Sequence, residues 1–73
     1  MENQIAIIDY TEQRDSIYID LEVFDAAHNR LYREEVRFLG ELLYGDLIHA
    51  ERSPLTEECR KQTVEYLKNY FNR

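Results

Sequence analysis

One segment near the N-terminus has a strict alternation of apolar and other residues. Between residues 16 and 24 every second residue is a branched apolar one, and the positions between are polar or aromatic: Ile17, Ile19, Leu21 and Val23 alternate with Tyr18, Asp20, Glu22 and Phe24. A period of two predicts a β-strand with one face buried and the other exposed.

A second strand is predicted just upstream. Residues 4–10 contain Ile5, Ile7, Ile8 and Tyr10, which are residue types that favour strands. The five residues 11–15 are all polar and suit a hairpin loop. We therefore expect an antiparallel hairpin made of strands 4–10 and 16–24.

From residue 26 onward the apolar period changes. Successive spacings of 4, 3, 4, 4 and 3 describe one stripe of an α-helix over residues 26–51: Tyr32, Val36, Leu39, Leu43, Leu47 and Ala50. Asp25 stands where the helix N-cap would be. Gly40 and Gly45 each cost about 1 kcal/mol inside a helix, so the sequence allows a break or bend near residue 45.

A different assignment of this stretch stays open. If residues 25–30 form a turn and residues 31–38 a third strand, the fold is a three-stranded meander followed by a helix. Glu34 would then share the buried face with Tyr32, Val36 and Phe38. The sequence favours the helix for this reason, and with it a helix content above the strand content.

A C-terminal helix is predicted over residues 54–72. Ser53 or Thr56 can cap it, Pro54 suits a first turn, and Glu57 and Glu58 complement the helix dipole. Its apolar face is expected to consist of Cys59, Thr63, Tyr66, Leu67, Tyr70 and Phe71. The predicted fold class is α+β, an N-terminal antiparallel β-hairpin packed on two C-terminal helices (ββαα) in a single small domain, residues 1–73.

Length and cysteine content limit how this fold is stabilised. A chain of 73 residues buries only about 60% of the surface that its unfolded form exposes. The single cysteine, Cys59, cannot form an internal disulfide. We expect stabilisation by association, with a partner or as a homodimer.

The charge is unevenly distributed. The net charge is −6, and residues 1–29 hold seven acids and one base while the remainder is balanced. Such a field opposes direct binding to nucleic acid or an anionic membrane and favours a basic protein surface. The start of the chain lacks a basic segment followed by an apolar run, and no apolar stretch reaches the ~20 residues of a membrane span, so we expect a cytoplasmic protein.

Chemical motifs are sparse. The pairs Asp25/His28 and Asp46/His49 have metal-ligand spacing, but they would lie about 31 Å apart on a continuous helix. Cys59 fits a buried structural thiol better than a reactive one. Two glycines in the chain leave little for a phosphate-binding loop. We expect no metal, no cofactor and no enzymatic activity.

A basic row, Arg30, Arg33 and Arg37, also has helical spacing. On a helix, Glu34 and Glu41 would follow Arg30 and Arg37 by four residues and pair with them. That arrangement indicates a solvated face rather than a phosphate-binding one.

The exposed face of the second strand is the candidate partner-binding surface, formed by Tyr18, Asp20, Glu22 and Phe24. Tyrosine supplies contact area with a polar group, and carboxylates pair with Arg or Lys across an interface. The alternative is that the carboxylates only keep this face soluble. The sequence thus predicts a small acidic module that occupies a basic surface of a larger protein, as an inhibitor, antitoxin, immunity protein or phage-encoded blocker does. The alternative function is a homodimeric structural or regulatory module with a helical interface.

Overall fold

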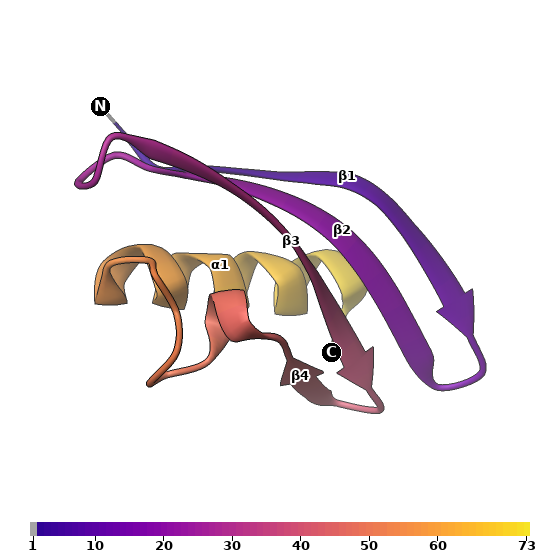
Figure 1. Ribbon diagram of the computed structural model, residues 1–73. Helices are drawn as coiled ribbons and strands as arrows, with labels where there is room; N and C mark the ends of the chain where they lie inside the picture. Colours follow the sequence, from indigo (N-terminus) through magenta and orange to yellow (C-terminus); the bar gives the residue numbers. More distant parts are fainter. Residues whose placement is uncertain (1) are drawn as a thin grey trace.

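Four antiparallel strands pair in the order in which they occur along the chain, and one helix follows them (Figure 1). The computed structural model describes residues 2–73. Its elements are β1 (Gln4–Gln13), β2 (Ser16–Asp25), β3 (Arg30–Leu39), β4 (Leu42–Tyr44), the short 3-10 helix η1 (Asp46–Ile48) and α1 (Glu57–Phe71). The fold class is therefore α+β, and residues 2–73 contain one α-helix instead of the two that were predicted.

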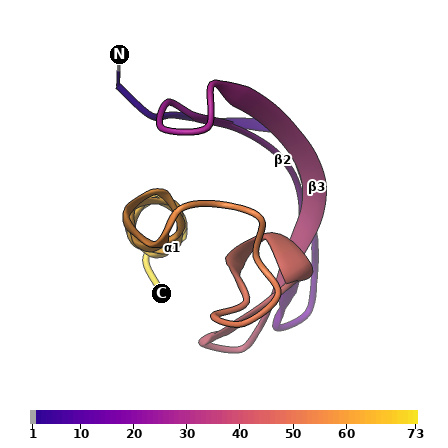
Figure 2. The same ribbon diagram turned by 60° about the vertical axis from the view of Figure 1, so that its left-hand side comes forward.

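The sheet curves around α1, which lies against its concave side (Figure 2). We call this side the inner face and the opposite side the outer face. The alternation predicted for β2 is confirmed, since its apolar residues on the inner face are all buried: Ile17, Ile19, Leu21 and Val23. Val36 and Phe38 of β3, Leu47 of η1 and Cys59 and Leu67 of α1 belong to the same core.

The N-terminal hairpin is present but differs in detail. β1 continues to Gln13, so three of the polar residues expected in a loop belong to the strand, and the turn is made by Arg14 and Asp15. Arg14 has a positive φ of 55°. The register shifts between Ile7 and Asp9, which marks a β-bulge at Ile8.

The helix predicted over residues 26–51 is wrong. Residues 26–29 are a turn that ends at Asn29, whose φ is 50°, and Gly40 with a φ of 62° turns β3 into β4. Gly45 also has a positive φ, of 150°, and in addition a Cβ there would lie 2.8 Å from Cγ1 of Val36. Both glycines thus mark points where the backbone turns or approaches a neighbour closely.

The meander alternative is the closer description, and Glu34 occupies the face that the sequence made unfavourable for it. Glu34 is paired with Leu21 and lies on the inner face of β3, as Val36 does. Its side chain is nevertheless exposed, although it lies between the half-buried Tyr32 and the buried Val36 on the same face. The inner face of β3 therefore accommodates a glutamate at this position, because its side chain reaches solvent.

The C-terminal helix is confirmed, although it begins at Glu57. The hydroxyl of Thr56 accepts the N–H of Cys59 and caps the first turn. Asn72 ends the helix in the left-handed conformation, and the N–H of Arg73 donates to the carbonyl of Lys68. None of the helices found between residues 2 and 73 has the length and apolar character to cross a membrane.

Asp25 joins the end of β2 to the start of α1 instead of capping the residues that follow it. Its buried carboxylate accepts the N–H of Thr56 at 2.7 Å, the hydroxyl of Thr56 at 3.2 Å and the N–H of Ala27 at 3.2 Å. Burial alone would raise the pKa of Asp25, but the hydrogen bonds from Thr56 and the nearby His28 outweigh it and lower the pKa. The carboxylate is therefore held ionised inside the protein.

Arg73 makes a second long-range connection, because its side chain contacts two hairpin turns. Its guanidinium donates to the carbonyl oxygens of Asp15 at 2.8 Å and Gly40 at 2.6 Å. The N–H of Gly40 in turn donates to the carbonyl of Asp15 at 3.1 Å. The β1–β2 and β3–β4 turns are thus fastened together beside the C-terminal end of α1.

Candidate functional site

The outer face of the sheet is the side away from α1 (Figure 2). The structure brings the four predicted partner-binding residues onto this face as alternate, half-buried positions of β2: Tyr18, Asp20, Glu22 and Phe24. They form one line because alternate residues of a strand lie on the same face. β2 is an internal strand, paired with β1 on one side and with β3 on the other, so this line is not at the edge of the sheet.

Three carboxylates lie in register across this face. Asp20 of β2 pairs with Asp9 of β1 and with Glu35 of β3. We call Asp9, Asp20 and Glu35 the acidic row. A shallow hollow of about 150 Å³ lies over it, also lined by Tyr10, Thr11 and Tyr18.

Asp20 is the member of the acidic row with a cationic partner. Nη2 of Arg33 lies 2.7 Å from Oδ2, and Nε of Arg33 lies 3.2 Å from Oδ1. These hydrogen bonds lower the pKa of Asp20 and raise the pKa of Arg33. The pair is solvent-exposed, so it offsets only part of the charge of the row.

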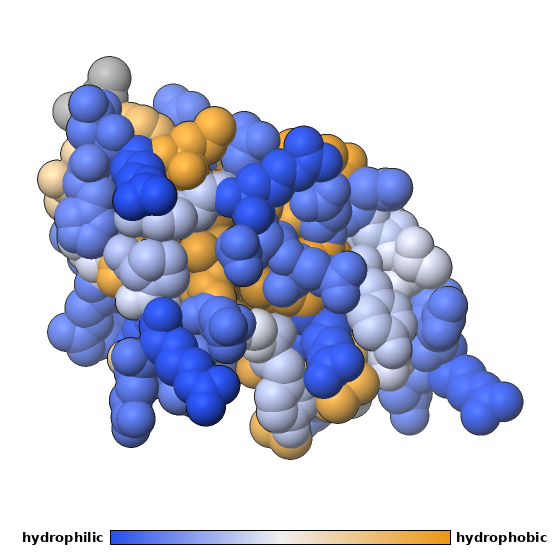
Figure 3. All heavy atoms as spheres, viewed as in Figure 1, coloured by the Kyte–Doolittle hydropathy of each residue, from blue (hydrophilic) through white to orange (hydrophobic). Residues whose placement is uncertain are grey.

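Apolar residues lie on the outer face at both ends of the strands, beyond the acidic row. Phe24 pairs with Leu31 at one end, where Leu31 is exposed, and Leu39, Leu42 and Tyr44 are exposed at the other. Figure 3 has the viewpoint of Figure 1, from which α1 and η1 are also in view, and it shows hydrophobic patches interrupted by hydrophilic side chains on that side of the molecule. The outer face thus combines a charged centre with apolar ends.

The basic residues of β3 do not form a helical row. Arg33 and Arg37 lie at outer-face positions of β3, opposite Glu22 and Tyr18. Arg30 lies at the start of the strand, with its guanidinium carbon 5.2 Å from the centre of the Tyr32 ring. The predicted pairing of Arg30 and Arg37 with residues one helical turn away is therefore wrong.

The other chemistry-bearing groups are explained by the fold. Nδ1 of His28 lies 3.4 Å from the buried carboxylate of Asp25, and Nδ1 of His49 accepts backbone N–H groups of the following turn. Within residues 2–73 no set of three or more His, Cys, Asp or Glu side chains is placed to hold a metal ion. Cys59 is fully buried, and burial together with the charge of Asp25 raises the pKa of its thiol.

Sequence reasoning missed two members of the acidic row. Asp9 follows three isoleucines within an apolar run, and only the bulge at Ile8 brings it opposite Asp20. Glu35 lies within the predicted helix 26–51, whereas the structure places it in β3. The sequence does not show which residues of neighbouring strands lie opposite one another, so the acidic row could be recognised only from the register of the sheet.

The comparisons with known proteins add no further guide to function. No protein-family model, curated protein or solved structure matches this chain. Function therefore has to be inferred from surfaces such as this one.

Proposed function

We propose that this protein is a small acidic binding module that uses the outer face of its sheet to occupy a basic surface of a larger protein. The observation that carries the proposal is the acidic row. Three carboxylates occupy directly opposed positions on three adjacent strands, where side chains lie about 5 Å apart, and Asp20 is paired with Arg33.

Like charges directly opposed across strands destabilise a sheet. An arrangement that costs folding free energy is expected where a binding function uses it. A lysine or arginine of a partner placed over the hollow would relieve the repulsion, and the ring of Tyr18 beside it would add contact area.

The charge of the whole chain supports the same class of partner. A net charge of −6 accelerates encounter with a basic protein and slows encounter with nucleic acid. Inhibitors, antitoxins, immunity proteins and phage-encoded blockers act by such occupation without catalysing a reaction. We place this activity in the cytoplasm and assign it no cofactor.

The test uses variants that remove charge and keep shape. The partner is first identified by zero-length carboxylate-to-lysine cross-linking, and its affinity is then measured for Asp9→Asn with Glu35→Gln. We expect about a tenfold or greater loss of affinity together with unchanged or increased thermal stability. The control, Glu41→Gln with Glu51→Gln, makes the same change of charge at exposed positions elsewhere.

Two results would contradict the proposal. One is equal affinity of the acidic-row variant and the control variant for the partner. The other is a stable dimer with no basic partner, which would favour the homodimeric module. In such a dimer the helical interface would be formed by α1 of each copy, since residues 26–51 do not form a long helix.

A further inference from the structure

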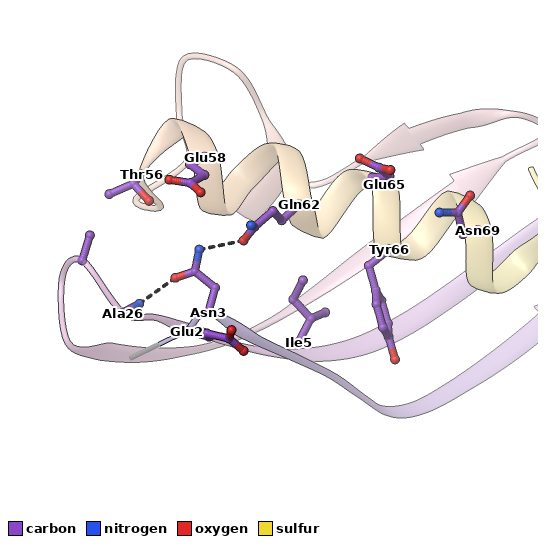
Figure 4. A pocket seen from close by; sticks show the side chains of 11 residues that line it. Glu2, Asn3, Ile5, Ala26, Thr56, Glu58, Gln62, Glu65, Tyr66 and Asn69 are labelled. Carbon is purple, nitrogen blue, oxygen red and sulfur yellow. Dashed lines mark hydrogen bonds between the residues drawn. The ribbon is translucent and has the colours of Figure 1, made fainter.

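An open cleft of about 940 Å³ separates the N-terminal part of β1 from α1 (Figure 4). Ile5 comes from β1, while Glu58, Gln62, Glu65 and Tyr66 come from α1. The cleft is on the inner side of the sheet, so it is a different surface from the acidic row.

The strand beside this cleft has a free edge. β1 is the first strand of the order β1-β2-β3-β4, pairs with β2, and is ten residues long. Residues 4–7, before the bulge, carry no charge. Asn3 fixes the start of the strand, since its amide oxygen accepts the N–H of Ala26 at 2.8 Å and its amide nitrogen donates to Gln62 at 2.7 Å. A fixed, uncharged strand edge is a template for another strand.

The charge of the cleft has one sign. Among the described residues that line it, Glu2, Glu58 and Glu65 are acidic and none is basic. Glu58 and Glu65 are seven residues apart on α1, about 10 Å along the helix axis. An extended chain covers that distance in about three residues, so one segment can reach both carboxylates.

Exposed tyrosines continue the cleft toward the end of α1. Tyr66 and Tyr70 are stacked with ring centres 6.2 Å apart, and Tyr70 lies 6.5 Å from Tyr10 of β1. All three are exposed despite this packing. The apolar face predicted for α1 is thus buried at Cys59, Thr63 and Leu67 but not at Tyr66 and Tyr70. Tyrosine rings attract Arg and Lys cations, the same class of group that the carboxylates favour.

We propose that an extended, lysine- or arginine-bearing segment of a partner protein adds as a strand to the free edge of β1 and lies in this cleft. Its backbone pairs with residues 4–7, and its basic side chains contact Glu58, Glu65 and the ring of Tyr66. A second copy of this chain is a poor occupant, because both copies carry a net charge of −6. The inference goes beyond the proposed function, since it does not need the outer face to bind anything.

The probe is a synthetic ten-residue peptide that alternates lysine with valine or threonine, titrated into the isotope-labelled protein. We expect saturable shifts of the amide signals of residues 3–7 and 58–69. The variant Glu58→Gln with Glu65→Gln should bind about tenfold more weakly, and Glu41→Gln with Glu51→Gln should bind as the parent does.

Two modified peptides test strand addition directly. One carries N-methyl groups on its odd-numbered amides and the other on its even-numbered amides, so both keep the charge and side chains of the probe. A strand added to an edge uses alternate amides for pairing. We therefore expect one of the two peptides to lose at least tenfold in affinity and the other to bind nearly normally.

Several outcomes would overturn the inference. These are equal binding by both methylated peptides, undiminished binding by the Glu58/Glu65 variant, a dimer whose interface protects β1 from exchange, and shifts confined to the acidic row. The last result would support the outer face instead. Retained peptide binding by Asp9→Asn with Glu35→Gln separates the two sites, because that variant changes only the outer face.

Discussion

The link between Asp25 and Thr56 is expected to be among the largest single contributions to stability. Asp25→Ala removes a carboxylate with 0% of its surface exposed, which accepts three hydrogen bonds. All three hydrogen bonds are part-buried, but Ala27 is an exposed residue whose N–H can turn to water more easily than the N–H and hydroxyl of the half-buried Thr56. Losing hydrogen bonds to a charged acceptor costs about 1.5–3 kcal/mol each.

We therefore expect Asp25→Ala to lower the free energy of unfolding by about 3 kcal/mol. Natural domains have about 0.05–0.15 kcal/mol of stability per residue, so this loss is a large part of the total for a chain of 73 residues. Urea unfolding followed by circular dichroism measures it. Asp20→Ala, on the same strand but with an exposed carboxylate paired to Arg33, should have a much smaller effect. A loss below about 0.5 kcal/mol for Asp25→Ala, the range of ordinary surface substitutions, would refute the reasoning.

The pH dependence provides a second check on the same group. Because the folded state lowers the pKa of Asp25, its contribution is complete above the unfolded pKa of about 3.9 and is lost as the pH falls through the folded value. The stability difference between the parent and Asp25→Asn should accordingly shrink as the pH drops below about 4. A difference that grows in acid would show that the carboxyl is stabilised in its protonated form.

Three further predictions use the same unfolding measurements. Both glycines have a positive φ, so replacing either by alanine strains the backbone by roughly 1 kcal/mol. Gly45→Ala should cost about 1–3 kcal/mol more because its Cβ would meet Val36, whereas no atom lies within 4 Å of a Cβ added at Gly40; equal losses would contradict the close approach. Cys59→Ser should cost about 1–3 kcal/mol, and the native thiol should react with a disulfide reagent only at the rate of unfolding; fast labelling of the folded protein would disprove its burial. Arg73→Ala should speed amide hydrogen exchange in both hairpin turns that its guanidinium contacts, and unchanged exchange there would show that the contact does not hold the turns.

The wrong helix in the middle of the chain has a geometric origin. A step of four residues keeps two side chains on the same side of a helix and on the same face of a strand. Tyr32 and Val36 therefore fit both structures. Only a step of three distinguishes them, and Leu39, three residues after Val36, is exposed on the other face of the sheet. The turn at Asn29 gave no clear local signal.

The candidate site was predictable in part for a similar reason. The alternation along β2 was sufficient to place Asp20 and Glu22 on one face. Their neighbours on other strands depend on register, and register depends on turn geometry and on the bulge at Ile8. The cleft could not be predicted at all, since it requires the position of α1 relative to the edge of β1.

The order of the elements along the chain also determines when the core can be completed during protein synthesis. Ribosomes add about 5–20 residues per second, so the stretch from the end of β3 to the end of α1 takes about 2–6 seconds to make. Throughout that interval the apolar side of the meander has no helix to cover it. An apolar side left uncovered in this way is prone to aggregation, so we expect chains released before α1 is made to aggregate rather than to fold.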